Sequence, residues 1–270
     1  MSTSTASNSN PLVAILTAIA LVPKAASDPF HHRQRNVTGH DQEELRRARF
    51  LFAGAGGINS WAVEAFARAG ATDIAICDAD SIDATNLARQ NFHAEQVGMP
   101  KASSLASNIQ PLLFAGGRVT AFSMTFEQAI AAYPIGTDVI LCGVDNNAGR
   151  LAVSRFARAR QIPAVFSMLS PDGMRCHCFL QGPAAEDACL WCALPDLDPA
   201  QAAFCDAGAI LASCFLVNAY ALFFTYRALM GWPGDVEPFN WREGNLLGTS
   251  PDRIGRVARR SDCIICSNPM

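Results

Sequence analysis

The sequence predicts an α/β protein in which helices cover both faces of a largely parallel sheet. From residue 49 onward, short apolar runs of strand length alternate with helical segments of about 10 to 15 residues, which is typical of a parallel sheet. A glycine-rich turn joins the first of these strands to the first helix. Half of the 270 residues are hydrophobic and 17 % are charged, which excludes disorder as the main state.

The predicted elements of the first half alternate in type. Each expected strand is a short run of mostly apolar side chains, and each expected helix carries apolar residues at helical spacing. Strands are expected over residues 50–53, 73–77, 118–122, 138–142 and 163–168, and helices over residues 60–69, 101–113 and 148–160. Strands linked by helices in this way form a parallel sheet that is buried on both faces.

The second half is less regular but still apolar. Residues 207–229 form one long apolar helix or two, and residues 236–241 and 254–257 are candidate late strands. Alternation around Cys176, His177 and Cys178 favours an edge strand over a metal site. Because these segments are hydrophobic enough to share the core, we expect residues 49–270 to form a single body.

Residues 1–48 are expected to be an N-terminal extension with helical pieces. The first ten residues are mostly Ser, Thr and Asn, which predicts disorder. Residues 11–22 are apolar but shorter than the roughly 20 residues that span a bilayer. A signal peptide is one interpretation, but the first 23 residues contain neither Lys nor Arg, so a helix packing on the body or on a partner is preferred. Residues 41–48 predict a short charged helix outside the core.

The net charge of the chain limits the kinds of partner expected, and its cysteine content indicates the cellular compartment. The chain has 21 Lys and Arg against 24 Asp and Glu, so its surface as a whole has no attraction for nucleic acid or anionic lipid. We therefore expect neither nucleic acid nor membrane as a partner. Ten cysteines are too dilute for a disulfide scaffold, and four of them form two CxxC pairs. Such pairs favour a reducing, cytoplasmic location and a bound metal ion.

The glycine-rich turn predicts a nucleotide site on a Rossmann-like fold. Gly54, Gly56 and Gly57 stand between a strand and a helix, where backbone N–H groups can approach a phosphate closely. Asp78 ends the next strand, where its carboxylate can accept hydrogen bonds from ribose hydroxyls. Asn59 replaces the third glycine of the dinucleotide pattern, which counts against NAD. A tight turn without a ligand is the plain alternative.

The residues that follow sharpen this prediction. They are Asp80, Asn86, Arg89, Gln90 and Lys101, in that order. The order and spacing of these residues resemble the pattern of the ThiF-type adenylating enzymes of the ubiquitin-activating superfamily. The resemblance covers about residues 49–266. The resemblance implies that Asp78 holds the ribose of ATP, that Arg89 contacts phosphate and that Lys101 contacts the triphosphate. Asp80, Asn86 and Gln90 belong to the same nucleotide site.

The same residues suit ATP chemistry on physical grounds. An adenylating enzyme must hold a triphosphate, leave its α-phosphorus open to a carboxylate and neutralise the departing pyrophosphate. Arg89 and Lys101 supply two positive charges for that task. Asp145 follows another predicted strand, so its carboxylate should emerge at the same sheet edge as the glycine turn. It matches the family's magnesium-associated aspartate, and a carboxylate there can hold Mg²⁺ on phosphate oxygens.

An arginine before the nucleotide fold is a further candidate. Arg33-Gln34 resembles the Arg-Gln pair found there in this family, whose arginine commonly reaches the phosphates, often those of a partner subunit. Arg35 is the competing choice, and a solvated basic cluster is the plain alternative. Because family members are usually dimers, we expect a homodimer.

The two CxxC pairs predict one structural zinc site. Cys189 and Cys192 form the first pair, and Cys263 and Cys266 form the second. Each pair has the spacing that places two thiolates on one tetrahedral ion, and many ThiF-type proteins carry paired knuckles here. The four ligands would tie the C-terminal tail to the body. A pair of redox-active dithiols is the alternative.

Cys205 differs from the remaining cysteines. It precedes a helix in a segment of small residues, where a thiolate can be exposed and stabilised by the helix N-terminus. Its position matches a segment that, in some ThiF-type enzymes, forms a thioester or persulfide with the carrier protein. An inert structural thiol is the alternative. Cys77, Cys142 and Cys214 are expected in the core.

The expected activity is ATP-dependent adenylation of the C-terminal carboxylate of a small ubiquitin-like or sulfur-carrier protein. If Cys205 is a nucleophile, a thioester follows, with transfer to a conjugating enzyme; a sulfur-carrier pathway needs a sulfur donor instead. The N-terminal extension slightly favours conjugation, and relatives that modify a peptide or a tRNA base are less favoured. The rivals are an NAD(P)-dependent oxidoreductase with structural zinc, in which Arg89, Lys101 and Asp145 lack a use, and a non-catalytic nucleotide-binding scaffold.

Overall fold

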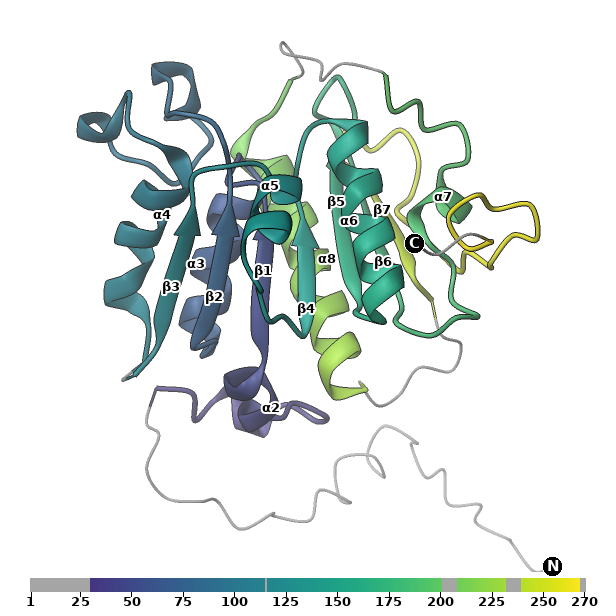
Figure 1. Cartoon of the computed structure of the whole chain (residues 1–270), viewed down its shortest axis with the longest axis horizontal. Coiled ribbons are helices and arrows are strands. Elements are labelled where there is room, and N and C mark those ends of the chain that lie inside the picture. The colour runs from purple at the N-terminus through teal and green to yellow at the C-terminus, as the bar shows by residue number, and fades with distance from the viewer. Residues whose placement is uncertain (1–29, 115, 201–207, 232–238, 268–270) are drawn as a thin grey trace, which may run out of the picture.

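Eight strands form one sheet in the order β3-β2-β1-β4-β5-β6-β7-β8 (Figure 1). The structure, a computed structural model, describes residues 30–114, 116–200, 208–231 and 239–267. The strands are β1 (Arg49–Ala53), β2 (Asp73–Cys77), β3 (Arg118–Phe122), β4 (Val139–Cys142), β5 (Ala164–Leu169), β6 (Arg175–Gln181), β7 (Trp241–Asn245) and β8 (Arg253–Gly255). The helices are α2 (Gln42–Arg47), α3 (Asn59–Ala69), α4 (Lys101–Ile109), α5 (Phe126–Ala132), α6 (Asn147–Arg160), α7 (Leu190–Ala193) and α8 (Leu211–Met230), with 3₁₀ turns η1 (Gln34–Asn36), η2 (Ala84–Asn86), η3 (Ala94–Gln96) and η4 (Gln110–Leu112).

The strands from β3 to β5 are parallel, as the alternation of strands and helices predicts. Ala53 at the end of β1 is in register with Cys77 of β2 on one side and with Cys142 of β4 on the other. The carboxyl ends of these three strands therefore meet at one edge of the sheet. The strand order reverses direction at β1, and in open α/β sheets ligands bind at such a point.

The last three strands extend the sheet in antiparallel fashion. The alternation around Cys176 predicts an edge strand, but β6 lies inside the sheet between β5 and β7, so that prediction is wrong. Alternation identifies a strand without identifying its neighbours. The late strands also lie at Trp241–Asn245 and Arg253–Gly255, displaced from the predicted ranges, and residues 232–238 lie outside the described part of the chain.

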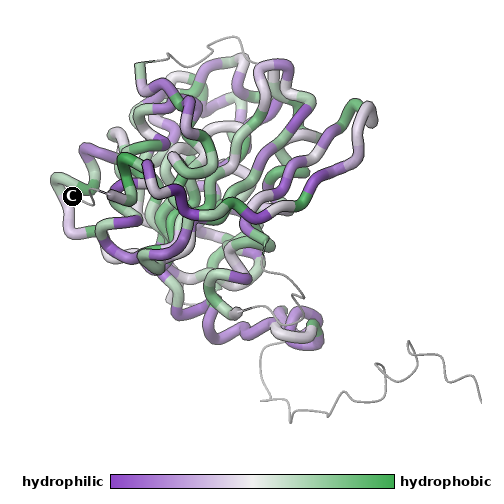
Figure 2. Tube along the Cα trace, turned by 90° about the vertical axis from the view of Figure 1, so that its right-hand side faces the viewer, coloured by the Kyte–Doolittle hydropathy of each residue, from purple (hydrophilic) through white to green (hydrophobic). Residues whose placement is uncertain are grey.

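Helices cover both faces of the parallel strands (Figure 1). Successive residues of β1 point to opposite sides: Leu51 and Ala53 join a buried cluster with α5 and α6, whereas Phe50 and Phe52 join one with α3 and α4. The second face is completed by α8, which packs on β5 and β6. In Figure 2 the hydrophobic segments gather in the interior of the molecule, and many hydrophilic segments lie on its outside.

Two helix boundaries are explained by the residues next to them. The helix predicted over residues 101–113 ends at Ile109 and continues only as the 3₁₀ turn η4, because Pro111 lacks the N–H that an α-helix needs. The helix α5 was not expected from the sequence. Thr125 and Gln128 form a capping box at its start, a signature that the sequence carries.

The described end of the N-terminal extension packs against the body. Although α2 is highly charged, Leu45 on its inner side is fully buried in the cluster with α3, so the expectation that this helix lies outside the core is wrong. The Nε2 atom of Gln42 donates to the Ala69 carbonyl at 2.8 Å, and Nε2 of His31 lies 3.2 Å from the Arg68 carbonyl oxygen. These side chains satisfy carbonyl groups that the end of α3 leaves without partners.

The long helix α8 is long and apolar enough to cross a membrane by length and composition alone. Its apolar window is 44 % buried, and the core helices of globular proteins pass the same test. Val217, Tyr220 and Phe224 pack with Val165 of β5 in one buried cluster. The helix α8 is therefore a core helix with one partly exposed side.

Candidate active site

A pocket of about 640 Å³ opens at the carboxyl ends of β1, β2 and β4. Ligand sites of small molecules are commonly of this size. Ten of the predicted site residues line it: Gly54, Gly56, Gly57, Asp78, Asp80, Asn86, Arg89, Gln90, Lys101 and Asp145. The register of the parallel strands thus brings together residues that are up to 91 positions apart, from 54 to 145.

The glycine turn is held by Asn59, a role that was not predicted from the sequence. The buried Nδ2 group of Asn59 donates to the carbonyl oxygens of Ala53 and Gly54, both at 2.9 Å, and lies 3.3 Å from that of Leu141 on β4. A Cβ atom at Gly143 would lie 2.6 Å from Asn59 Oδ1, so glycine is required there. The glycine missing from the dinucleotide pattern is therefore compensated by one at the end of β4.

Asp78 is fixed by backbone groups from two segments. Its Oδ2 accepts from the Ala55 N–H at 2.6 Å, and its Oδ1 accepts from the Asp80 N–H at 2.8 Å. Burial raises the pKa of Asp78 above its ordinary value, although these two hydrogen bonds and the charge of Lys101 oppose the rise. Each carboxylate oxygen still has a lone pair free, so Asp78 can accept hydrogen bonds from a ribose.

Lys101 is the first residue of α4 and is only 8 % exposed. Its Nζ lies 2.8 Å from Asp80 Oδ2, and its backbone N–H donates to the Asp80 carbonyl at 2.8 Å. The Asp80 side chain is 69 % exposed, so this carboxylate neutralises the lysine from the solvent side of the pocket. A phosphate that enters the pocket can take over that pairing.

The segment around η2 carries three polar side chains to the pocket. Asn86 uses its Oδ1 to accept from the Asp83 N–H at 3.0 Å, which leaves its amide N–H groups for a ligand. The Arg89 guanidinium donates to the Thr85 carbonyl at 2.9 Å. Gln90 is only 5 % exposed, and its Oε1 has no hydrogen-bond partner among the described residues.

The opposite wall of the pocket is built by the end of β4 and the start of α6. Asp145 is exposed there, and Asn146 caps the helix by accepting from the Gly149 N–H at 2.7 Å. Arg150, in the first turns of α6, also lines the pocket and was not predicted. Burial lowers the pKa of its guanidinium. Its signal in the sequence is its place five residues after Asp145, at the start of a helix that begins at the ligand edge.

Of the other two residues predicted for this site, Arg33 does not line the pocket, and Cys205 is not among the described residues. Arg33 is exposed beside η1, in the segment that packs on the C-terminal end of α3, at the sheet end opposite the carboxyl ends of the strands (Figure 1). Cys205 falls within residues 201–207, outside the described residues. Gly208 and Ala209, where the described chain resumes, line the pocket together with Cys214.

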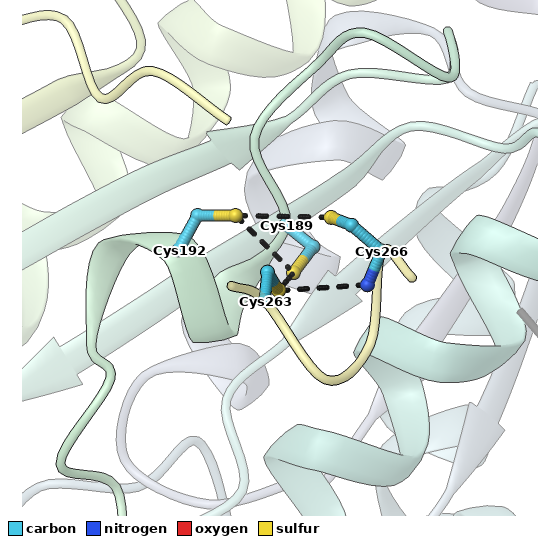
Figure 3. Close-up of side chains that lie close together, drawn as sticks. All are labelled: Cys189, Cys192, Cys263 and Cys266. Atoms are coloured by element: carbon cyan, nitrogen blue, oxygen red, sulfur yellow. Dashed lines mark hydrogen bonds between the residues drawn. The ribbon is translucent and has the colours of Figure 1, made fainter. Parts of the chain in front are cut away.

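The four CxxC cysteines converge on one point, as predicted (Figure 3). Their Sγ atoms all lie within 4.8 Å of one another; Cys189 is 3.3 Å from Cys263, and Cys192 is 3.7 Å from Cys266. All four are buried and free of disulfides. Thiolates on one tetrahedral zinc ion stand about 3.8 Å apart, given zinc–sulfur bonds of about 2.3 Å. The cluster therefore suits a metal ion and joins the C-terminal loop to α7.

The other described cysteines are buried. Cys77 and Cys142 lie in the core as predicted, whereas Cys214 is buried but also faces the glycine turn, where its Sγ would be 3.3 Å from a Cβ at Gly57. Cys176 and Cys178 pack against α8. Within the described ranges, the CxxC cluster is the one group of three or more potential ligands that could hold a metal, so no second site forms around His177.

Two of the relatives that this chain resembles are named adenylyltransferases. The chain is 32 % identical over 166 residues to the adenylyltransferase and sulfurtransferase UBA4 of Yarrowia lipolytica, covering 60 % of this chain and 40 % of that protein. It is 30 % identical over 143 residues to the molybdopterin-synthase adenylyltransferase of Escherichia coli, covering 50 % and 56 %. It is 31 % identical over 122 residues to the tRNA threonylcarbamoyladenosine dehydratase of Escherichia coli, covering 44 % and 45 %. The chain thus spans about half the length of these relatives.

Solved structures share the fold. The structure of Escherichia coli MccB with ATP superposes with a TM-score of 0.68 at 16 % identity, covering 84 % of this chain and 69 % of that chain. At this identity the likeness concerns the fold alone. The model of the ThiF family matches residues 31–251, which include the whole pocket. This chain belongs to the ThiF family.

Proposed function

We propose that this chain is an ATP-dependent adenylyltransferase that activates the C-terminal carboxylate of a small ubiquitin-like or sulfur-carrier protein. The observation that carries the proposal is the pocket itself. Asp78, Arg89, Lys101 and Asp145 come from four separate segments and line one cavity beside the glycine turn. The relatives named above as adenylyltransferases support the same activity.

Each residue has a role that its position supports. The N–H groups of the glycine turn and of the start of α3 face the phosphates, and Asp78 accepts from the ribose. The carrier carboxylate attacks the α-phosphorus, the bond to the pyrophosphate breaks, and an acyl-adenylate forms. Arg89 and Lys101 neutralise the negative charge that moves onto the pyrophosphate.

The carboxylate of Asp145 fits a magnesium ion. It is exposed at the pocket wall opposite Asp78, and carboxylate oxygens are ligands that Mg²⁺ accepts together with phosphate oxygens. Asp145 would hold the ion, which supplies further neutralisation of the phosphates. The oxidoreductase alternative explains neither Asp145 nor the two cations, and we do not retain it.

We propose that the four CxxC cysteines hold a structural zinc ion. The thiolate donor set and the spacing of the Sγ atoms support zinc over a redox pair. Four protein ligands leave no open position, so the ion would stabilise the fold without activating water. It would tie the C-terminal loop to β6 through α7.

We propose further that Cys205 takes the acyl group from the adenylate. Gly208 and Ala209 follow it closely in sequence and line the pocket, which supports a place near the activated carboxylate. The thiolate would attack the carbonyl carbon, AMP would leave, and a thioester would form. A conjugating enzyme would then receive the carrier, or a sulfur donor would act on it in a sulfur-transfer pathway.

We propose a homodimer that forms through α8. The exposed side of this helix carries Leu211, Phe215 and Ala219, which are spaced four residues apart. Phe215 is 49 % exposed and meets the ring of Trp61 edge-on at 5.3 Å. An apolar stripe of this length supports a protein partner. Arg33, which lies away from the pocket of its own chain, would then be available to the pocket of the second copy.

One experiment tests the activity. Purified chain is incubated with ATP, labelled pyrophosphate and candidate carriers that end in glycine, and the label returning to ATP is measured. We expect carrier-dependent exchange, and a carrier adduct on a non-reducing gel that Cys205→Ala abolishes while exchange continues. ATP binding without exchange for any carrier would favour the scaffold alternative, and protection by NADH but not by ATP would favour the oxidoreductase.

A further inference from the structure

We propose that Arg150 is a phosphate-binding residue of the pocket, and that the hydrogen bonding of its guanidinium is completed only when the nucleotide is bound. This assignment rests on the proposed ATP chemistry and deepens it, because the two predicted cations that line the pocket, Arg89 and Lys101, both lie on one side of it. Arg89 and Lys101 stand on the side of β2, whereas Arg150 stands on the side of β4, next to Asp145. A triphosphate between the two walls would meet positive charge from both sides.

The hydrogen bonding of Arg150 is incomplete. Its Nη1 donates to Asn147 Oδ1 at 2.9 Å, but its Nε is buried without a hydrogen-bond partner in the described part of the chain. Within those same residues no carboxylate lies within 4.0 Å of it. A buried guanidinium without an anion is costly, and buried charges are ordinarily paired. Asp145 is near enough to influence its charge but makes no ion pair with it.

A second arginine of the same helix is held by protein groups away from the pocket. Arg158 is buried two turns further along α6, and its two Nη groups donate to the carbonyl oxygens of Ala184 and Asp187. The Nε of Arg158, like that of Arg150, has no hydrogen-bond partner among the described residues, but both of its Nη groups are bound by carbonyl groups outside the pocket, which is a structural role. Arg150 differs because the space in front of it is the pocket and not protein.

Asn147 holds the guanidinium of Arg150 in position. Asn147 accepts from Arg150 and donates its Nδ2 hydrogen to the Asp198 carbonyl at 3.0 Å, so the loop after α7 and the first turn of α6 both hold the guanidinium. A planar guanidinium held in this way can offer two parallel N–H groups to phosphate oxygens. The phosphates of the nucleotide are therefore the proposed anion, in preference to the carboxylate of the carrier.

Calorimetric binding of Mg·ATP and of adenosine tests the proposal, with Arg150→Met and Arg158→Met as the matched pair. For Arg150→Met we expect at least about a tenfold loss of ATP affinity, unchanged adenosine affinity and a melting temperature that does not fall, because an unpaired buried charge is removed. For Arg158→Met we expect a lower melting temperature and unchanged ATP affinity, because two hydrogen bonds are lost outside the pocket.

Three results would overturn the assignment. Wild-type ATP affinity in Arg150→Met would remove the phosphate contact. A fall in melting temperature matching that of Arg158→Met, with ATP affinity unchanged, would make Arg150 structural. A raised KM for the carrier with unchanged ATP affinity would assign it to the carboxylate. If the wild-type chain itself binds no ATP, the proposed function fails with it, which is a different result from a loss confined to the variant.

Discussion

The Nζ atom of Lys101 lies 2.8 Å from Asp80 Oδ2, so the most buried cation of the pocket is neutralised before any nucleotide arrives. This pairing keeps the lysine ordered at the start of α4 without a large stability gain, because Asp80 is mostly exposed. The lysine can exchange a carboxylate for a phosphate at little cost. The catalytic contribution of Lys101 should therefore greatly exceed its contribution to folding.

Lys101→Met is expected to lower pyrophosphate exchange at least about 100-fold, because a cation facing the leaving group is lost. The free energy of unfolding should change by no more than about 1 kcal/mol. Arg68→Ala is the control: Arg68 pairs with Glu64 at 2.7 Å on the surface of α3, and its loss should leave exchange unchanged. Full exchange activity in Lys101→Met would refute the proposed site.

Asn59→Ala is expected to destabilise the protein by about 2 to 3 kcal/mol, because the Ala53 and Gly54 carbonyl groups lose a buried donor. Urea unfolding followed by circular dichroism measures this change. The exposed Asn36→Ala is the matched control and should stay within about 0.5 kcal/mol of the wild type. Equal stability of both variants would mean that Asn59 does not hold the glycine turn.

The free energy of unfolding should depend on pH through the titration of Asp78. Because burial raises its pKa in the folded state above the ordinary 3.8, its contribution is fully present below that value and is lost as pH rises through the raised pKa. Relative to Asp78→Asn, the wild type should therefore lose stability as pH rises over this window. Urea unfolding at several pH values measures the difference.

Asp138 provides a control of opposite sign. Its hydrogen bond with Arg49 lowers the pKa of this carboxyl, so its contribution is present above the ordinary value and is lost as pH falls through the lowered pKa. Relative to Asp138→Asn, the wild type should thus lose stability on acidification. The same slope in both comparisons would contradict the assignment for Asp78.

Removal of metal should destabilise the C-terminal part of the fold. Elemental analysis is expected to find one zinc ion per chain, and Cys263→Ser should lose the zinc together with at least about 3 kcal/mol of folding free energy. Cys176→Ala, a buried cysteine outside the cluster, should keep the metal. A metal-free wild type with reversible Cys189–Cys192 oxidation would support the redox alternative.

Phe215→Glu should convert the proposed dimer to a monomer, because a carboxylate on the apolar stripe of α8 cannot be buried unpaired. Light scattering after size exclusion should then give the monomer mass of 28.9 kDa, against twice that value for the wild type. Tyr133→Glu, at an exposed position after α5, is the control and should stay dimeric. A monomeric wild type in which residues 11–22 cover α8 would contradict the dimer.

Much of the fold and of the pocket could be predicted because both depend on patterns along the chain. Buried strands such as Asp73–Cys77 were located by their apolar runs, and parallel strands place their carboxyl ends together. Gly54 and Asp78 directly follow strands and Asp145 comes three residues after one, so their meeting at one edge follows from the topology. The CxxC spacing likewise predicted the cysteine cluster.

Tertiary structure was needed wherever a role depends on a neighbour distant in the chain. In the sequence, Asn59 is a departure from the dinucleotide-binding motif. Its role in holding the glycine turn is evident only in the folded chain, where it contacts Leu141 and Gly143. Arg150 was one helix residue among several arginines until its place in the pocket set it apart from Arg158. Periodicity encodes which side of an element is buried, whereas the distances between elements arise only when the chain packs.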